Sequence, residues 1–506
     1  MKGKDEVMRS SGVLMHISSL PSPYGIGTMG KEARKFADFL EKSGQKYWQI
    51  LPICPTSYGD SPYQSFSSFA GNPYFIDLEY LCKEKLLKKA ECESFPWGKK
   101  ADKVDYGVMY ESRYKLLKIA FERFLRAEPD DFEAFCEKEA DWLSDYALFM
   151  ALKDANGGNA WFSWEKDLKM RKPEALAEAR STYAKDIRFY QMLQYLFFKQ
   201  WWELKAYVNE KGIEIIGDVP IYVAGDSADV WANPEEFYLD EDLNPIDVAG
   251  CPPDAFSEDG QLWGNPLFRW DVMKKNGYTW WTKRIAAMSK LYDIVRIDHF
   301  RGFDSYYAIP AKDKTAKNGE WRKGPGMDLF HTLEQKLGRL NIIVEDLGFL
   351  TPSVLKLVAD SGFPGMKVIQ FAFDSREGSN YLPHMTICIS SHILEELSKI
   401  ATDYGIIHNG SLLQEITREE LMRRCSERME LTLDHPKLAI PVLDSMGFTN
   451  FQVTDKEHIH IFERLNESAV LNMELAKAGI PVKGISITSE ELETYFLNLT
   501  GGTDHA

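Results

Sequence analysis

The chain has 506 residues, of which 44% are hydrophobic and 27% charged, the composition of a globular protein. Its net charge of −16 argues against a nucleic-acid partner, because contact with a phosphate backbone requires a basic surface. The length is too great for one ordinary domain, although a barrel with insertions can account for most of it.

The seven cysteines are scattered, and no CxxC pair occurs. This pattern is typical of reduced thiols in the cytoplasm and indicates neither a disulfide framework nor a zinc site. The first residues, MKGKDEVMRSSG, lack the apolar core of a signal peptide, and no run of about 18 apolar residues follows. We therefore expect a cytoplasmic protein without a membrane segment.

Short apolar segments that end in polar residues recur along the first three quarters of the chain. GVLMHI at 12–17 is the first, and the amphipathic segment 31–44 after it predicts a helix that stops at a glycine. Further segments follow at 47–52, 213–220, 293–300, 342–348 and 366–374. Strands that alternate with helices predict an α/β fold with a parallel sheet, and polar strand ends are typical of a TIM barrel. Because only six such strands precede residue 385, we expect a (β/α)8-type barrel truncated after about six strands.

Residues 78–205 interrupt this alternation. They contain charged helical patterns such as ESRYKLLKIAFERFL. We expect them to form a helical insertion after the second strand.

The composition changes near residue 385. All 13 tryptophans precede residue 322, whereas only six Phe and Tyr residues but six of the ten histidines follow Met385. A simultaneous loss of aromatic residues and gain of histidines indicates a boundary. We therefore place one domain at 1–384.

Two carboxylates stand at the ends of neighbouring predicted strands. In RIDHF, Asp298 lies two residues after Arg296, so both side chains point to the same side of the strand. A cation beside a carboxylate keeps it ionised, as a nucleophile requires. VEDLG places Glu345 at the end of the next strand, and two carboxyl groups about 5–5.5 Å apart are the geometry of retaining glycoside chemistry. The alternative is that Arg296 and Asp298 form a structural ion pair and that Glu345 and Asp346 cap a helix.

Two long loops, GDSPYQSFSSFAGNPY at 59–74 and PPDAFSEDGQLWGNP at 252–266, combine aromatic and polar residues. Sugar sites have this composition, because sugar rings present apolar C–H faces and polar rims. Each of these aromatic residues, taken singly, could instead pack in the core and have no contact with a sugar.

Five long motifs occur in order between about residues 8 and 384. They are YWQILPICPTSYGDSPYQSFSSFAGNPYFID, GDVPIYVAGDSADVWANP, FSEDGQLWGNPLFRW, VRIDHFRGF and VEDLGFLTPSV. Together they resemble the amylomaltases, the 4-α-glucanotransferases or disproportionating enzymes of glycoside hydrolase family 77. A single RIDHF-like motif indicates only the wider α-amylase group. The SPYQS and GQLWGNP loops restrict the resemblance to the amylomaltases within that group.

The resemblance implies roles for the residues that match these motifs. Asp298 matches the nucleophile that forms a β-glucosyl-enzyme intermediate, Glu345 the acid/base, and Arg296 the arginine that keeps the nucleophile ionised. The residues implied in substrate binding are Arg296, Asp218, Ser61, Tyr63, Phe256, Gln261, Trp263 and His299, with Phe256 in a loop that covers the acceptor sugars. The implied substrates are maltodextrins and other α-1,4-glucans, and the family needs no metal or organic cofactor.

The resemblance ends at LPH (382–384). There the family continues to a seventh strand with a Thr-His-Asp motif. The aspartate of this motif binds the hydroxyls of the sugar ring that is distorted during the reaction. In this chain SSH supplies a histidine, His392, but the next residue is Ile393. The third catalytic aspartate is therefore missing, and we expect impaired activity.

The remaining residues resemble the end of an ABC transporter ATPase of the bacitracin-export type. Residues 385–417 match the last strand, switch histidine, helix and strand of its nucleotide-binding domain, and 418–506 match its accessory C-terminal region. No GxxxxGK[ST] loop, signature motif or Asp-Glu strand end occurs, so no ATP binding is expected. The chain thus resembles a fusion near His384/Met385. Its C-terminal α+β fragment begins with the strand–helix–strand order of barrel strands 7 and 8. One hypothesis is that these elements partly close the barrel, and the alternative is an open six-strand sheet with an exposed edge.

The sequence accordingly predicts a 4-α-glucanotransferase of reduced activity that works by a retaining double displacement. The alternatives are an inactive α-glucan-binding pseudoenzyme, an amylase-type hydrolase and, from the C-terminal residues alone, an ABC transporter ATPase subunit.

Overall fold

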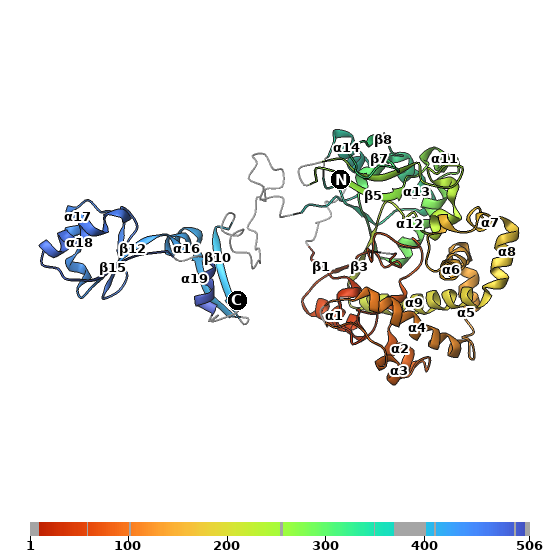
Figure 1. Cartoon of the computed structure of the whole chain (residues 1–506), viewed down its shortest axis with the longest axis horizontal. Coiled ribbons are helices and arrows are strands. Elements are labelled where there is room, and N and C mark those ends of the chain that lie inside the picture. The colour runs from red at the N-terminus through yellow and green to blue at the C-terminus, as the bar shows by residue number, and fades with distance from the viewer. Residues whose placement is uncertain are drawn as a thin grey trace, which may run out of the picture. The chain divides into compact units, whose positions relative to one another are not determined.

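The structure, a computed structural model, describes residues 10–57, 59–100, 103–253, 257–348, 350–368, 401–408, 411–489 and 492–500. The chain divides into two compact units, Met1–Lys367 and Val368–Ala506 (Figure 1). The predicted boundary between residues 384 and 385 lies outside the described residues.

Five short strands form a parallel sheet in the first unit. They are β1 (Gly12–Leu14), β2 (Tyr47–Gln49), β3 (Glu214–Val219), β6 (Ile294–Ile297) and β9 (Ile342–Val344). Their order in the sheet is β1-β2-β3-β6-β9, so the sheet grows in one direction as the chain proceeds. A doubly wound sheet reverses direction, whereas growth in one direction is the arrangement of a TIM-barrel-like fold. The α/β class and five of the six predicted strands are therefore confirmed.

The sixth predicted strand, 366–374, lies mostly outside the described residues. Residues 366–368 are described and are not part of a strand. Immediately before them, Gly365 forms a parallel bridge with Val344 of β9. The truncation of the barrel after six strands stays a prediction.

Helices occupy the interval between β2 and β3, and no strand occurs among the described residues there. They are α2 (Leu78–Lys83), α3 (Lys89–Glu93), α4 (Tyr106–Phe124), α5 (Phe132–Lys138), α6 (Ala140–Ala155), α7 (Lys166–Lys169), α8 (Pro173–Thr182) and α9 (Ala184–Glu210). The remaining helices of this unit are α1 (Lys31–Lys42), α10 (Ala228–Ala232), α11 (Trp270–Lys275), α12 (Thr279–Leu291), α13 (Met327–Leu337) and α14 (Pro352–Ser361).

Local signals in the sequence explain where helix α14 begins and ends. The Thr351 side chain accepts a hydrogen bond from the backbone N–H of Val354 at 3.3 Å, and Pro352 fills the first helical position. Gly362 follows the helix with φ of +66°, the left-handed conformation that glycine adopts without steric cost. These local signals set the bounds of the helix that follows β9 in the chain.

A second, antiparallel sheet lies within the same unit. It consists of β4 (Asp247–Cys251), β5 (Gln261–Pro266), β7 (Ser305–Pro310) and β8 (Glu320–Lys323), in the order β5-β4-β7-β8. Strand β5 carries the predicted GQLWGNP loop residues, so this sheet holds one of the two aromatic loops.

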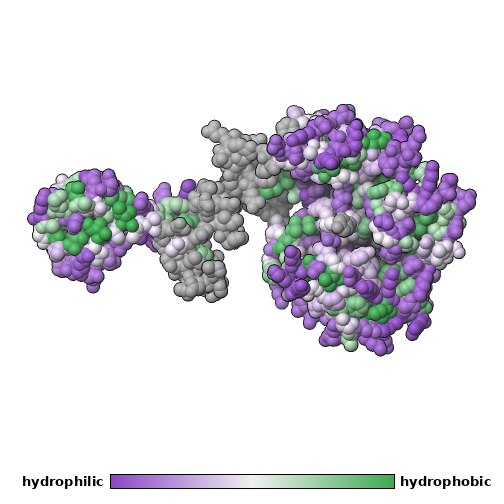
Figure 2. All heavy atoms as spheres, in the orientation of Figure 1, coloured by the Kyte–Doolittle hydropathy of each residue, from purple (hydrophilic) through white to green (hydrophobic). Residues whose placement is uncertain are grey.

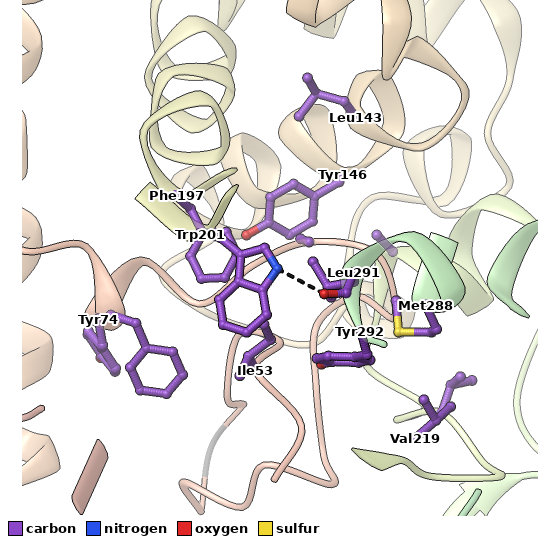
Figure 3. Packing of buried hydrophobic residues seen from close by; sticks show 14 of the residues in the cluster. Ile53, Tyr74, Leu143, Tyr146, Phe197, Trp201, Val219, Met288, Leu291 and Tyr292 are labelled. Atoms are coloured by element: carbon purple, nitrogen blue, oxygen red, sulfur yellow. Dashed lines mark hydrogen bonds between the residues drawn. The ribbon is translucent and has the colours of Figure 1, made fainter. Parts of the chain in front are cut away.

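Trp201 of α9 is central to the core between the helical insertion and the parallel sheet (Figure 3). Its side chain is 1% exposed, and its indole Nε1 donates a hydrogen bond to the carbonyl oxygen of Leu291 at 3.1 Å. Its ring lies edge-on to that of Tyr292, with 6.1 Å between centroids. The helical insertion is therefore fixed to the end of α12 by both packing and a hydrogen bond.

We expect the Trp201→Ala variant to lose about 3–5 kcal/mol of stability, because the substitution leaves a large cavity in a close-packed core. Its neighbour Trp202 is 41% exposed, so Trp202→Ala should cost less than about 1 kcal/mol. Urea unfolding of both variants measures the difference. Equal losses in the two variants would contradict the central position of Trp201.

In the second unit, residues 428–488 form a ferredoxin-like β-α-β-β-α-β arrangement. Its elements are β12 (Arg428–Leu433), α17 (Ile440–Ser445), β13 (Phe451–Val453), β14 (His458–Ile461), α18 (Ser468–Lys477) and β15 (Val482–Thr488), with the antiparallel sheet order β13-β14-β12-β15. Alternate residues of β12 and β14, including Met429, Leu431 and Ile459, are buried in this unit's own core. The alternation explains why one face of the sheet is apolar.

A hairpin of β10 (Asp403–His408) and β11 (Ser411–Thr417) precedes this arrangement, with α16 (Arg418–Cys425) and, at the end, α19 (Leu492–Thr500). The predicted strand GIIHNG lies largely in β10, but β10 pairs antiparallel with β11. A barrel strand would pair in parallel with its neighbours, so the described pairing of β10 differs from that expected for an eighth barrel strand. The segment TICIS and the residue His392 lie outside the described residues.

On the visible face of residues 1–367, hydrophilic residues predominate and apolar ones occur in small separate groups (Figure 2). Within the described parts of the chain, no helix is both long and apolar enough to span a membrane.

Candidate active site

Three carboxylates stand at the C-terminal ends of three neighbouring strands of the parallel sheet. Asp218 is the fifth residue of β3, Asp298 follows β6, and Glu345 follows β9. The pair Ile297 and Val344 is in register between β6 and β9, so Asp298 and Glu345 are the next residues on adjacent strands. Adjacent strands lie about 4.8 Å apart, so the backbones of Asp298 and Glu345 are neighbours.

Arg296 joins two of these carboxylates. Its Nη1 lies 2.5 Å from Asp218 Oδ1 and 2.9 Å from Asp298 Oδ1. The side chain of Asp298 is 31% exposed, whereas that of Asp218 is 1% exposed. Asp298 is therefore the carboxylate of this pair that a substrate can reach, and Asp218 acts from behind it.

Burial and charge oppose each other in this ion-pair group. Burial raises the pKa of Asp218, although Arg296 and a hydrogen bond from Tyr63 act in the other direction. For Arg296, burial acts to lower the pKa, but the two carboxylates outweigh it and raise the pKa overall. The guanidinium thus remains a fixed cation beside Asp298.

Glu345 is held by two backbone donors. The N–H of His299 lies 2.9 Å from Glu345 Oε2, and the N–H of Leu347 lies 2.6 Å from Oε1. Burial raises the pKa of Glu345, and the two hydrogen bonds oppose that rise. A carboxyl group with a raised pKa is suited to donate a proton near neutral pH.

His299 has a left-handed backbone conformation, with φ of 52° and ψ of 49°. This conformation is costly for a residue with a Cβ, and such strain collects at functional sites. It places the His299 N–H on Glu345, and the His299 ring lies edge-on to Trp263 with 4.9 Å between centroids. Burial lowers the pKa of His299 to about 4, so the ring is neutral at neutral pH.

The two aromatic loops reach this group of carboxylates. From the first loop, Tyr63 donates a hydrogen bond from its hydroxyl to Asp218 Oδ2 at 2.7 Å, and Ser61 Oγ accepts one from the Tyr63 N–H at 3.3 Å. From the second, the indole of Trp263 donates to Gln261 Oε1 at 3.0 Å. The structure thus brings together all the predicted site residues except Phe256, which lies outside the described residues.

The sequence did not predict the residues that connect the two aromatic loops, or the contact that Arg296 makes with a residue after β9. Gln64 Nε2 donates to Asn265 Oδ1 at 3.0 Å, which links the two aromatic loops directly. Both residues lie inside the quoted motifs, so a signal was present. By contrast, the sequence indicated no site role for Met366 of the sixth predicted strand. The sulfur of Met366 accepts a hydrogen bond from Arg296 Nε at 3.1 Å. The sequence predicts at most a helix cap for Asp346, but this residue accepts a hydrogen bond from the Met366 N–H at 2.7 Å.

Among the described residues, no group of three or more His, Cys, Asp or Glu side chains is arranged to hold a metal ion. The chemistry available at the strand ends is that of paired carboxyl groups, one beside a fixed cation and one with a raised pKa. On a TIM-barrel-like sheet this arrangement defines the class of carboxylate-dependent glycoside-processing enzymes.

Comparison with known proteins narrows this class. The family model described as 4-alpha-glucanotransferase, glycoside hydrolase family 77, matches residues 15–398. The 4-alpha-glucanotransferase of Clostridium butyricum is 53% identical over 371 residues, which are 73% of this chain and 76% of that protein. That of Thermus thermophilus is 51% identical over 383 residues, 75% of this chain and 76% of that protein. The chain therefore belongs to glycoside hydrolase family 77, the 4-α-glucanotransferases.

Solved structures agree with this membership. The amylomaltase from Streptococcus agalactiae in complex with acarbose has a TM-score of 0.73 and 46% identity, and the match covers 74% of this chain and 77% of that one. The amylomaltase from Corynebacterium glutamicum, at 21% identity and a TM-score of 0.56, shares the fold; that match covers 70% of this chain and 50% of that one.

Proposed function

We propose that this protein transfers segments of α-1,4-glucans between maltodextrins by a retaining double displacement. The observation that carries the proposal is the arrangement of Arg296, Asp298 and Glu345, with a partly exposed carboxylate held by a buried cation next to a carboxyl group of raised pKa. The loop residues Tyr63 and Trp263 support it, because an aromatic ring beside hydrogen-bonding groups suits a sugar ring.

In the first step, an oxygen of Asp298 forms a bond to the anomeric carbon while the glycosidic bond breaks. The leaving oxygen takes the proton of Glu345, and a β-glucosyl ester of Asp298 results. In the second step, the ionised Glu345 accepts the proton of an acceptor hydroxyl. The acceptor oxygen then attacks the anomeric carbon, which releases Asp298 and restores the α-linkage.

The surrounding residues support these steps by position. Arg296 donates a hydrogen bond to Asp298, and its positive charge stabilises that group as the leaving carboxylate. The two backbone N–H groups on Glu345 fix the orientation of its carboxyl group. We assign Asp218, Ser61, Tyr63, Gln261, Trp263 and His299 to sugar binding, and Phe256 to a loop over the acceptor that disfavours water as the acceptor.

We expect the raised pKa of Glu345 to govern the alkaline limb of the pH–rate profile. Since the group must be protonated in the first step, kcat/KM for maltotriose should fall as pH rises through a midpoint above the ordinary glutamate value of 4.5. With α-maltosyl fluoride, whose leaving group needs no proton, the limb should disappear. Identical limbs for both donors would assign the ionisation to another group.

We further propose that the activity is reduced, because Ile393 follows the histidine where the family pattern has its third catalytic aspartate. We propose that residues 385–506 derive from the end of a transporter ATPase and that Glu395 and Glu396, one helical turn past the predicted strand end, do not replace that aspartate. We propose that residues 385–506 bind no ATP, and that the protein acts in the cytoplasm.

The same missing aspartate favours a second candidate function, an inactive protein that binds α-glucans. Incubation with maltotriose distinguishes the two. Release of glucose together with longer maltodextrins supports the transferase. Binding of maltotriose without any new product supports the pseudoenzyme, and reducing ends without longer products would indicate a hydrolase.

A further inference from the structure

A cavity of about 340 Å³ lies between the helical insertion and the barrel helices, and none of the strand-end carboxylates lines it. Its walls come from α5, α6 and α9 on one side and from α10, α12 and the loop at 67–69 on the other. A volume of this size is within the range of small-molecule sites. Figure 3 shows three of its wall residues, Tyr146 of α6 and Met288 and Leu291 of α12.

The walls are rich in aromatic side chains. They comprise Phe69, Phe135, Trp142, Tyr146, Phe198, Trp202 and Trp280. The ring of Phe198 lies between those of Trp142 and Trp202, at centroid distances of 5.9 Å and 6.2 Å. Trp202 is 41% exposed, which is unusual for so large an apolar ring. The cavity therefore offers an accessible aromatic surface.

The charged groups at the cavity are nearly balanced in number, and several of them have partners. Three lysines and four carboxylates line it. Lys283 pairs with Asp141 at 2.9 Å, and Asp145 pairs with Arg171 at 3.0 Å. Glu139 accepts a hydrogen bond from the indole of Trp142 at 2.8 Å. This balance disfavours a phosphate or a cation and leaves carboxylate oxygens as acceptors for neutral hydroxyls.

Two wall residues also carry polar atoms without a partner. Trp280 and Tyr146 are 5% and 1% exposed, and neither Trp280 Nε1 nor the Tyr146 hydroxyl has a hydrogen-bond partner among the described residues. Buried donors are nearly always satisfied, so a ligand or water that entered here after a small shift of the wall would find two vacant donors.

We propose that this cavity is an accessory carbohydrate site that binds one or two glucose units of an α-1,4-glucan. The proposal rests on the proposed function for the choice of glucan, whereas the neutral sugar class follows from the aromatic walls, the balanced charge and the vacant donors. A sugar bound in the cavity would also affect the first aromatic loop, 59–74. Asp229 of the cavity wall accepts a hydrogen bond from the N–H of Ser68 in that loop at 2.7 Å.

The test uses the full-length protein labelled with 5-fluorotryptophan and followed by fluorine NMR during titration with maltose. We expect the resonances of Trp142 and Trp202, assigned from single Trp→Phe variants, to shift in a saturable manner. Trp202→Ala should weaken that binding about tenfold or more, as judged from the Trp142 resonance. The control variant is Phe162→Ala, since Phe162 is 44% exposed in the same helical insertion and lies outside the cavity wall.

The resonance of Trp263 reports on the active site in the same experiment. Failure of Trp263 to respond while Trp142 and Trp202 shift would count against the proposed function and leave the accessory site standing. Absence of any shift at Trp142 and Trp202, or an equal loss of binding in Phe162→Ala, would overturn the accessory site. Stronger shifts with inorganic phosphate than with maltose would also overturn the accessory carbohydrate site. Equal shifts with cellobiose and maltose would show that the site has no preference for α-linked glucose.

Discussion

The Asp298→Asn variant is expected to lose glucan transfer by a factor of about 10⁴ or more, because a carboxamide cannot form the ester intermediate. The fold should be unaffected, since Asp298 lies after β6 and its side chain is 31% exposed. The measurement is the rate of glucose release from maltotriose, compared with the unaltered protein at the same concentration.

Rescue by azide separates the two carboxylates by role. With α-maltosyl fluoride as donor, Asp298→Ala should accept azide as a direct nucleophile, which displaces fluoride and gives the β-maltosyl azide. Glu345→Ala should still form the ester on Asp298, so that azide attacks second and gives the α-maltosyl azide. The anomeric configuration of each product is read from its proton coupling constant.

A matched control is Asp218→Asn, which removes a charge from the same Arg296 group without touching the reacting atoms. It should lower the rate less than Asp298→Asn and should give no azide product. If Asp298→Asn kept more than a tenth of the activity, or if both alanine variants gave the same anomer, the assigned roles would be wrong.

Much of the parallel sheet and of the site could be predicted from the sequence, because both follow from local patterns. Each strand is a short apolar run with a polar residue at its end, and in a sheet that grows in one direction those ends meet at one edge. Asp298 and Glu345 are therefore brought together by strand order alone. The ion pair of Arg296 with Asp298 likewise follows from their spacing of two residues on one strand.

The contacts that the sequence did not predict depend on the exact path of loops. The hydrogen bond between Gln64 and Asn265 joins residues about 200 positions apart, and no periodicity relates them. The left-handed conformation of His299 is similarly hidden, because no glycine marks it. Such conformations are maintained by the surrounding contacts, here the hydrogen bond to Glu345, rather than by local propensity.

The cavity was also missed, for a different reason. Trp142 and Trp202 belong to the helices α6 and α9, and a large aromatic residue in a helix is ordinarily part of the core. Only the packing of α6 and α9 against α12 shows that these rings line a space instead of filling one.

The second prediction with a large effect concerns residues 385–506. Replacing them with the segment by which the family continues through its Thr-His-Asp motif should raise transfer from maltotriose by about 10²–10³-fold, the usual value of one group that stabilises a transition state. In the proposed mechanism Asp298 and Glu345 supply the covalent and proton-transfer steps, whereas the resemblance implies that the aspartate of that motif holds sugar hydroxyls more tightly in the transition state than in the ground state.

A gain of activity in this graft could come from the added aspartate or from the added strands. A second graft distinguishes these two causes. When the aspartate of the grafted motif is replaced by asparagine, the added strands remain but the charged acceptor does not. If the missing aspartate limits the rate, this second graft should stay close to the unaltered chain in kcat while its unfolding midpoint rises with that of the first graft. If instead the predicted truncation of the barrel is limiting, both grafts should gain equally. A rate in the unaltered chain that already equals the first graft would show that residues 385–506 impair nothing, and it would require another group to grip the sugar beside Asp298 and Glu345.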